Sequence, residues 1–140
     1  MATKYTFEYI PQPSLDSSGK LVDVYRPYVP IRLEYGHKID NPFYALVDSG
    51  SDRNLLPAAF GVVLGINIRK GKPRDITGIG QHALKAYTHQ VGFFLGARKF
   101  KTEVDFSYEQ TIPLLGRTGF FDLFYSINFN EKKRKLELMI

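Results

Sequence analysis

One acidic residue of this 140-residue chain follows directly on an apolar run, in the segment Phe43-Tyr-Ala-Leu-Val-Asp48-Ser-Gly-Ser51. Asp-Ser-Gly alone is a common turn, because Asp and Ser side chains bond the local backbone and Gly accepts positive φ. Here the run before Asp48 is typical of a buried strand, and Asn54-Leu-Leu-Pro57 returns at once to apolar character. A carboxylate between two core segments is expected to be partly buried, which is costly unless the group is paired or used in chemistry.

Much of the remaining sequence also favours strands. Residues 83–95 and 99–106 alternate between apolar and polar side chains, and Gly96-Ala-Arg98 between them suits a hairpin turn. Residues 126–129 and 135–139 indicate a second hairpin that closes the chain. The 9 Tyr and 11 Phe fit a strand-rich fold. The sequence therefore predicts an all-β domain built as a closed or orthogonally packed barrel.

One or two short helices are expected beside these strands. Residues 57–64 start with a proline, which suits the first helical position, and Gly65 suits the position after the last. Near the C-terminus, Phe120, Leu123 and Phe124 lie at helical spacing.

The length is that of one domain, too short for two separate cores. We expect residues 28–140 to form this domain and residues 1–27 to be an extension. Within the extension, residues 4–9 predict a strand, and the Pro-, Ser- and Gly-rich residues 11–20 predict a loop.

Composition narrows the partners and cofactors. The sequence contains no cysteine, so it offers no disulfide and no Cys-ligated zinc or iron–sulfur site. The N-terminus has no signal-peptide pattern, and no run approaches the roughly 18–20 apolar residues of a membrane helix. We therefore expect a soluble cytoplasmic protein with no membrane partner and no cofactor.

The net charge of +5 raises the question of nucleic acid as a partner. Much of the basic excess lies in Arg69-Lys-Gly-Lys-Pro-Arg74 and Lys132-Lys-Arg-Lys135, both expected to be solvated loops or turns. Net charge bears on association and not on fold. We do not expect nucleic-acid binding as the main role. A basic RNA- or DNA-associated protein with this fold is kept as a third interpretation, after the two given below.

Other site patterns are incomplete. His37, His82 and His89 are scattered, so no metal site is expected. The segment Gly78-Ile-Gly-Gln-His-Ala83 fits a dinucleotide-binding pattern, but that pattern must open a helix and the residues that follow indicate a strand. No nucleophile elbow surrounds Ser49 or Ser51.

Three separated segments resemble the retropepsin family of aspartic proteases. Val47-Asp-Ser-Gly-Ser-Asp52 is similar to its catalytic signature, and Leu114-Leu-Gly-Arg117 to the motif before its C-terminal helix. Ile76-Thr-Gly-Ile-Gly-Gln-His-Ala-Leu-Lys85, between them, resembles the flap hairpin, and residues 119–124 look like those of bacterial retropepsin-like proteins. The resemblance covers about residues 28–140 and implies a retropepsin-like acid-protease barrel with a short helix near the C-terminus.

The resemblance implies an aspartic endopeptidase whose substrate is a peptide or protein. Such enzymes use two facing carboxylates that share one proton and activate a water molecule. This chain has only one such motif, at Asp48. The second carboxylate would therefore be Asp48 of another copy, and the active form would be a two-fold homodimer.

The resemblance also gives roles to neighbouring residues. Ser49, Gly50 and Ser51 would support the catalytic loop, with the Ser49 hydroxyl in place of the family's usual Thr, bonding across the dimer axis. Asp52 would bind substrate main-chain amides and form an ion pair with Arg117 inside one subunit. A planar, always-charged guanidinium suits a partly buried carboxylate.

The segment Gly78-Ile79-Gly80 would be the tip of a mobile flap that closes over substrate and excludes water. An ordinary hairpin turn is the alternative for these glycines. The main rival for the whole chain is a retropepsin-fold binding or dimerisation module that cleaves little or nothing, since a fold does not guarantee its function.

Overall fold

The computed structural model describes residues 3–78 and 80–140. Most of the described chain is in β-strands, as predicted. The strands in chain order are β1 (Lys4–Glu8), β2 (Ile10–Leu15), β3 (Leu21–Arg26), β4 (Tyr28–Tyr35), β5 (Lys38–Ile39), β6 (Phe43–Val47), β7 (Leu55–Pro57), β8 (Lys72–Thr77), β9 (Ala83–Leu95), β10 (Arg98–Ser107), β11 (Leu114–Leu115), β12 (Ser126–Asn130) and β13 (Lys135–Met139).

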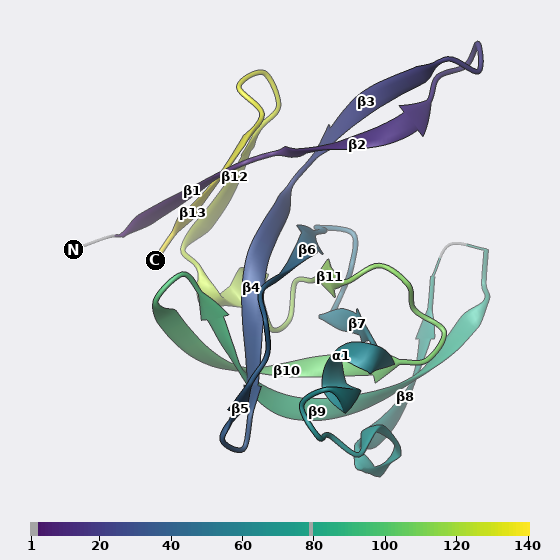
Figure 1. The fold of residues 1–140 in the computed structure, drawn as a ribbon, viewed down its shortest axis with the longest axis vertical. Coiled ribbons are helices and arrows are strands. Elements are labelled where there is room, and N and C mark those ends of the chain that lie inside the picture. Colours follow the sequence, from purple (N-terminus) through teal and green to yellow (C-terminus); the bar gives the residue numbers. More distant parts are fainter. Residues whose placement is uncertain (1–2, 79) are drawn as a thin grey trace.

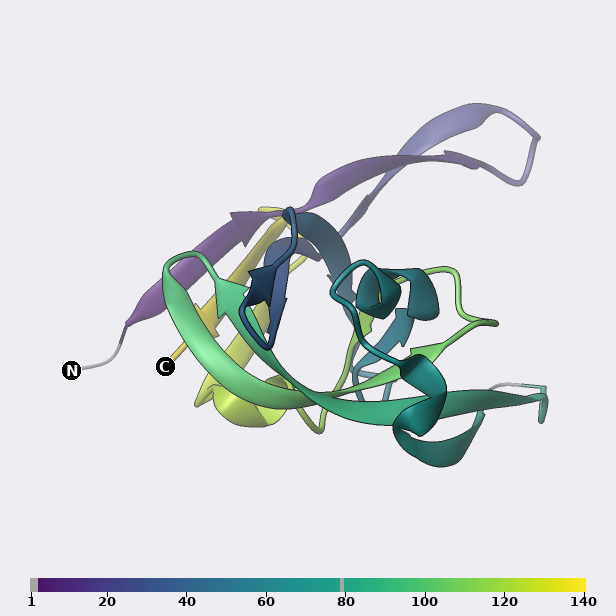
Figure 2. The same ribbon diagram turned by 60° about the horizontal axis from the view of Figure 1, so that its bottom comes forward.

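Six of these strands close into a barrel, which confirms the predicted fold class. The strand order is β5-β4-β6-β11-β7-β10-β9-β8, and an additional antiparallel pairing of β4 with β9 closes the ring. The long antiparallel pair β9 and β10 forms a curved part of the barrel wall, and β8 pairs with β9 outside the ring (Figures 1 and 2). The hairpin turn predicted at residues 96–98 joins these two strands.

The barrel interior is filled by apolar side chains from the alternating strands. Phe93 and Phe106 are fully buried, and Phe120 packs against Phe93 with 5.8 Å between ring centroids. Alternation places every second side chain of a strand on the same face, so one face of β9 and β10 forms core, and residues 104–107 of β10 are buried on both faces. Phe124 adds a further ring, 5.1 Å from that of Phe120.

A second, three-stranded sheet joins the two ends of the chain. Its order is β1-β13-β12, and all neighbours are antiparallel (Figure 1). Leu136 and Leu138 of β13 are fully buried beneath it. The Tyr9 hydroxyl donates a 2.7 Å hydrogen bond to Glu131. The pKa of Tyr9 is raised, mainly by burial and to a smaller extent by this hydrogen bond. Both the predicted N-terminal strand and the predicted closing hairpin are found here.

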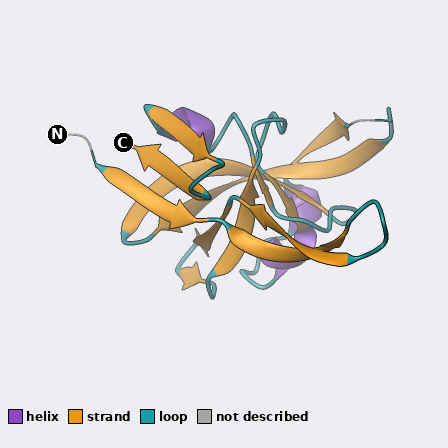
Figure 3. Ribbon diagram, turned by 90° about the horizontal axis from the view of Figure 1, so that it is seen from above, coloured by secondary structure: helices purple, strands orange, loops and turns teal. Residues whose placement is uncertain are grey.

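Helical structure is sparse (Figure 3). The helix expected at residues 57–64 is present as α1 (Ala58–Val62), and Gly65 after it has a φ of +81°. Two single turns of 3-10 helix complete the set, η1 (Ile68–Lys70) and η2 (Phe121–Leu123). The element near the C-terminus is thus shorter than an α-helix. Within the described residues, no helix is long and apolar enough to cross a membrane.

The prediction of a loop at residues 11–20 is wrong. Strands β2 and β3 form a hairpin around a turn in which the Asp16 carboxylate accepts hydrogen bonds from the N–H groups of Ser18 and Lys20, each 2.9 Å long. The Pro-, Ser- and Gly-rich composition that predicts a loop also fits a hairpin, because proline is tolerated in an edge strand when its nitrogen faces away from the ladder.

The Phe120 ring packs against three other phenylalanine rings, so its removal tests the packing of the core. We expect Phe120→Ala to lower the free energy of unfolding by about 3–5 kcal/mol, because it leaves a cavity. Tyr125→Ala is the control, because Tyr125 is 90% exposed, and should change it by less than about 0.5 kcal/mol. Urea unfolding measures both, and similar losses would contradict this description of the core.

Candidate active site

Asp48 lies at the end of β6, where the strand gives way to a tight turn. Its N–H donates a 3.0 Å hydrogen bond to the Leu115 carbonyl, and its own carbonyl accepts one of 3.1 Å from Ser51. The Oδ1 atom accepts a 2.9 Å hydrogen bond from the Gly50 N–H. Asp48 is half-buried, as expected for a carboxylate flanked by core segments. Its position is therefore set by the backbone on both sides.

The residues after Asp48 form an exposed rim. Ser49 and Gly50 are exposed, and the half-buried Ser51 hydroxyl donates a 2.8 Å hydrogen bond to the Arg53 carbonyl. A Cβ atom on Gly50 would lie 3.2 Å from Asp48 Oδ1, which is a tight contact. Glycine at this position thus lets the backbone pass close to the carboxylate.

Strand β11 holds the loop from the other side. It runs parallel to β6 and antiparallel to β7, so it lies between the strands that enter and leave the Asp48 turn. Gly116 follows, and a Cβ there would lie 2.4 Å from the Arg53 carbonyl oxygen, which only glycine avoids. The buried Asn54 side chain accepts a hydrogen bond from the Gly116 N–H (3.0 Å) and donates one to the Glu103 carbonyl (3.1 Å).

The predicted ion pair between Asp52 and Arg117 is not among the ion pairs of the described residues. Both residues are exposed. The two segments meet through the backbone instead: the Arg117 N–H donates to the Ser51 carbonyl (2.9 Å) and the Thr118 N–H to the Asp52 carbonyl (2.8 Å). The motifs adjoin as the resemblance implied, but their contact does not use the two charged side chains.

A different arginine, Arg53, forms an ion pair with a buried carboxylate, that of Asp105. Arg53 Nε lies 2.7 Å from Asp105 Oδ2, and its terminal nitrogen hydrogen-bonds Glu103 at 3.0 Å. Asp105 is fully buried and accepts a further 2.6 Å hydrogen bond from the Thr88 hydroxyl. The hydrogen bond to Asp105, more than that to Glu103, raises the pKa of Arg53. Sequence reasoning missed this pair.

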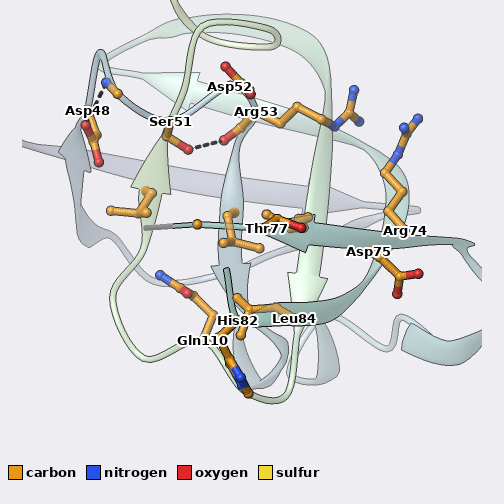
Figure 4. Close-up of a pocket in the computed structure, with 15 residues that line it drawn as sticks. Asp48, Ser51, Asp52, Arg53, Arg74, Asp75, Thr77, His82, Leu84 and Gln110 are labelled. Carbon is orange, nitrogen blue, oxygen red and sulfur yellow. Dashed lines mark hydrogen bonds between the residues drawn. The ribbon is translucent and has the colours of Figure 1, made fainter. Parts of the chain in front are cut away.

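The same cluster reaches the strand that leads to the proposed flap. Arg74, on β8, donates a 2.7 Å hydrogen bond from Nε to the Thr88 hydroxyl, and lies 3.9 Å from Asp105 Oδ1. Figure 4 shows Arg53 and Arg74 on one side of the pocket, with Asp48 at the opposite side. One buried carboxylate thus connects the segment after the Asp48 turn to β8 through two arginines.

The hairpin predicted as a flap is formed by β8 and β9. Their last pair before the turn is Thr77 with Ala83, and the Gln81 N–H donates a 3.2 Å hydrogen bond to the Gly78 carbonyl. Gly80 has a φ of +91°, a conformation that suits glycine. Ile79, the third predicted flap residue, lies outside the described residues.

A cleft of about 560 Å³ lies between the Asp48 loop and this hairpin (Figure 4). Asp48, Gly50 and Ser51 line one wall, while Thr77 and Gly78 line the other. Its apolar lining is supplied by Leu55, Ile76, Leu84 and Leu114. The space is therefore bordered by a half-buried carboxylate, an exposed backbone rim and apolar side chains.

The histidines contribute no metal site in the part of the chain that the structure describes, where no group of three or more His, Cys, Asp or Glu side chains could hold a metal ion. His89 hydrogen-bonds the Ile68 carbonyl through Nε2 at 2.8 Å, and His82 lines the cleft.

Comparisons with known proteins agree on the fold. No protein-family model matches the sequence, and no curated protein does so significantly. A retropepsin-like aspartic protease from Rickettsia conorii superposes with a TM-score of 0.63 at 16% identity, covering 99% of this chain and 92% of that one. EIAV protease in complex with the inhibitor HBY-793 superposes with a TM-score of 0.54 at 25% identity, covering 66% and 82%. The chain therefore has the fold of the retropepsin-like aspartic proteases.

The buried ion pair beside the cleft can be tested by stability. Asp105→Ala would leave the Arg53 guanidinium partly buried without its main partner, and we expect it to lower the free energy of unfolding by about 3–5 kcal/mol. Asp75→Ala removes an exposed carboxylate that lies 3.3 Å from Lys85, and should cost less than about 1 kcal/mol. Equal losses in urea unfolding at pH 7 would argue against a structural role for Asp105.

Proposed function

We propose that this protein is an aspartic endopeptidase that acts as a homodimer, with Asp48 of each subunit facing the other. The observation that carries the proposal is the half-buried Asp48 carboxylate, held by backbone hydrogen bonds at the wall of an apolar cleft in a retropepsin-like fold. The similarity to EIAV protease supports the same reaction class. One chain supplies one such carboxylate, so the site is complete only with a second copy.

In the proposed reaction the two Asp48 carboxyls share one proton, because two like charges this close do not both ionise cheaply. The ionised carboxylate takes a proton from water while the water oxygen attacks the peptide carbonyl carbon. The protonated partner donates its proton to the carbonyl oxygen. As the resulting diol collapses, the protonated carboxyl gives its proton to the leaving nitrogen and the ionised carboxylate takes one from a diol hydroxyl. The C–N bond breaks, an acid and an amine are released, and the pair again holds one proton.

The cleft supplies the means to hold an extended peptide. Leu55, Ile76, Leu84 and Leu114 would accept apolar side chains of the substrate, since burial of apolar surface drives such contacts. Asp52 would bind substrate main-chain amides. The flap segment Gly78-Ile79-Gly80 would close over the peptide from the opposite side and exclude water.

The exposed residues that follow Asp48 support the proposal of a homodimer. The Ser49 hydroxyl is exposed, as a group that bonds across a dimer axis would be in a single subunit. Serine lacks the methyl group that restricts the threonine rotamer, so its hold on the partner is expected to be looser. Gly50 and Ser51 keep the backbone close to the carboxylate and would support the paired loops.

Replacing the proposed catalytic carboxylate tests the chemistry. We expect Asp48→Asn to lower cleavage of a peptide library across pH 3–7 by at least about a hundredfold, because the amide can neither take up nor share the proton. Asp122→Asn is the control: the exposed Asp122 accepts a hydrogen bond from the Gly119 N–H, and asparagine can do the same.

Dimerisation is measured on the same proteins by sedimentation equilibrium. Asp48→Asn should still dimerise, and wild-type cleavage per chain should rise with protein concentration as dimers form. Equal residual cleavage by wild type and Asp48→Asn would refute the proposed chemistry. A stable dimer without cleavage would instead favour the binding or dimerisation module.

A further inference from the structure

Strands β2 and β3 form an arm, residues 10–26, that stands apart from the rest of the molecule. Within the described residues the two strands pair only with each other, and they project beyond the barrel in both Figure 1 and Figure 2. An isolated two-stranded hairpin is at best marginally stable in water. A projecting arm of this kind therefore calls for a surface on which it rests.

The base of the arm is fixed to the body of the subunit. The Arg134 guanidinium lies over the Tyr25 ring, 3.7 Å from its centroid, and the Tyr9 N–H donates a 2.8 Å hydrogen bond to the Arg134 carbonyl. After the arm, the Pro27 carbonyl accepts a 3.0 Å hydrogen bond from Val47. The direction of the arm is thus set by contacts at its base.

Next to the polar turn of residues 16–20, the outer end of the arm carries exposed apolar side chains. Leu15 and Leu21 are opposite each other in the register, so their side chains share one face, and they are 69% and 68% exposed. Pro13 and Pro11 follow on the same face at alternating positions, and both are exposed. Exposed contiguous apolar surface of this kind commonly marks an interaction site.

The two outer edges of the arm differ. The Asp16 N–H donates to the Lys20 carbonyl at 2.9 Å, so the next pair, Leu15 with Leu21, is not hydrogen-bonded, and the pattern alternates from there. Pro11 and Pro13 therefore lie where an N–H would point away from β3, and they block the outer edge of β2. The outer edge of β3 keeps its backbone groups, at Leu21, Asp23 and Tyr25.

The arm also starts beside the candidate active site. Gln12, Ser14 and Arg26 of the arm line a hollow together with Leu46 and Ile112. Leu46 lies two residues before Asp48 on β6, and the arm projects past the end of that strand (Figure 1). A second subunit that brings its Asp48 to this Asp48 would approach on the side where the arm extends.

The geometry points to the arm as a clasp for a second copy of this chain. The exposed pair Leu15 and Leu21 and the open edge of β3 would rest on the partner subunit beside the shared cleft, so each subunit holds the other. Charge does not oppose this contact, because Asp16 and Asp23 offset Lys20 and Arg26 within the arm. This inference rests on the homodimer of the proposed function.

A double variant at the tip tests the clasp. We expect Leu15→Ser/Leu21→Ser to raise the dimer dissociation constant of the full chain at least about tenfold in sedimentation equilibrium, because the two leucine side chains no longer gain from burial. Val62→Ser/Val63→Ser is the matched control. It removes an exposed apolar pair at the end of α1, 53% and 57% exposed, and should change the constant by less than about twofold.

A shortened arm provides a second test that does not depend on the serine variants. Replacing residues 13–23 by Asn-Gly would join the hydrogen-bonded pair Gln12 and Val24 by a two-residue hairpin turn. The barrel should keep its circular dichroism spectrum, while the dimer weakens at least as much as in the double variant. An unchanged constant, an equal rise in the α1 control, or a wild type that remains monomeric would overturn the clasp.

Cleavage assays separate this inference from the proposed function. If cleavage depends on Asp48 but the arm variants dimerise like wild type, the clasp is wrong and the protease assignment stands. If the arm variants weaken the dimer but Asp48→Asn changes nothing, the chemistry is wrong and the clasp stands. An arm variant with an unchanged dimer and a raised KM would assign the arm to substrate binding, which also overturns the clasp.

Discussion

The site depends on a close backbone contact between Gly116 and Arg53. A side chain at position 116 would collide with the Arg53 backbone, and the buried Asn54 amide bridges the two segments. This contact keeps β11 between β6 and β7, so the turn that carries Asp48 cannot shift without breaking barrel pairing. Among the described residues Asp48 has no ion pair. Its carboxylate is placed by main-chain geometry, with Oδ1 accepting the hydrogen bond from the Gly50 N–H.

The Arg53–Asp105 ion pair is a different kind of constraint. Removing a carboxylate and a guanidinium from water is costly, and their attraction compensates only where geometry and extra hydrogen bonds are good. Here the fully buried Asp105 also accepts a hydrogen bond from the Thr88 hydroxyl. The Thr88 oxygen in turn accepts a hydrogen bond from Arg74 Nε. The main effect of the ion pair is therefore to fix the positions of the segments it joins, and not to add a large net gain in stability. The pair connects the segment after the Asp48 turn to β10, β9 and β8 at one end of the cleft.

Period-two alternation predicted β9, β10 and the closing hairpin well, because burial of one face leaves a direct imprint on composition. The Asp48 loop was equally visible, since a carboxylate after an apolar run is rare without a reason. Side-chain partners were not predictable in this way. Arg53 and Arg117 have similar chemistry, and only the three-dimensional course of the chain brings Asp105 to the former. The sequence carried no signal for this pair, because Asp105 falls on a polar position of the alternation in residues 99–106 and only the structure shows that it is buried. The arm was missed because its prolines are compatible with an edge strand as well as with a loop.

Those prolines also limit how many chains can associate through the arm. A hairpin with two open edges can add strands on both sides, and such growth leads to fibres. With Pro11 and Pro13 on its outer edge, β2 cannot take part, and only β3 can accept a strand. Strand addition at the arm therefore ends after one partner. A solvent-exposed hairpin with apolar side chains and one open edge is in this way compatible with a closed assembly of defined size.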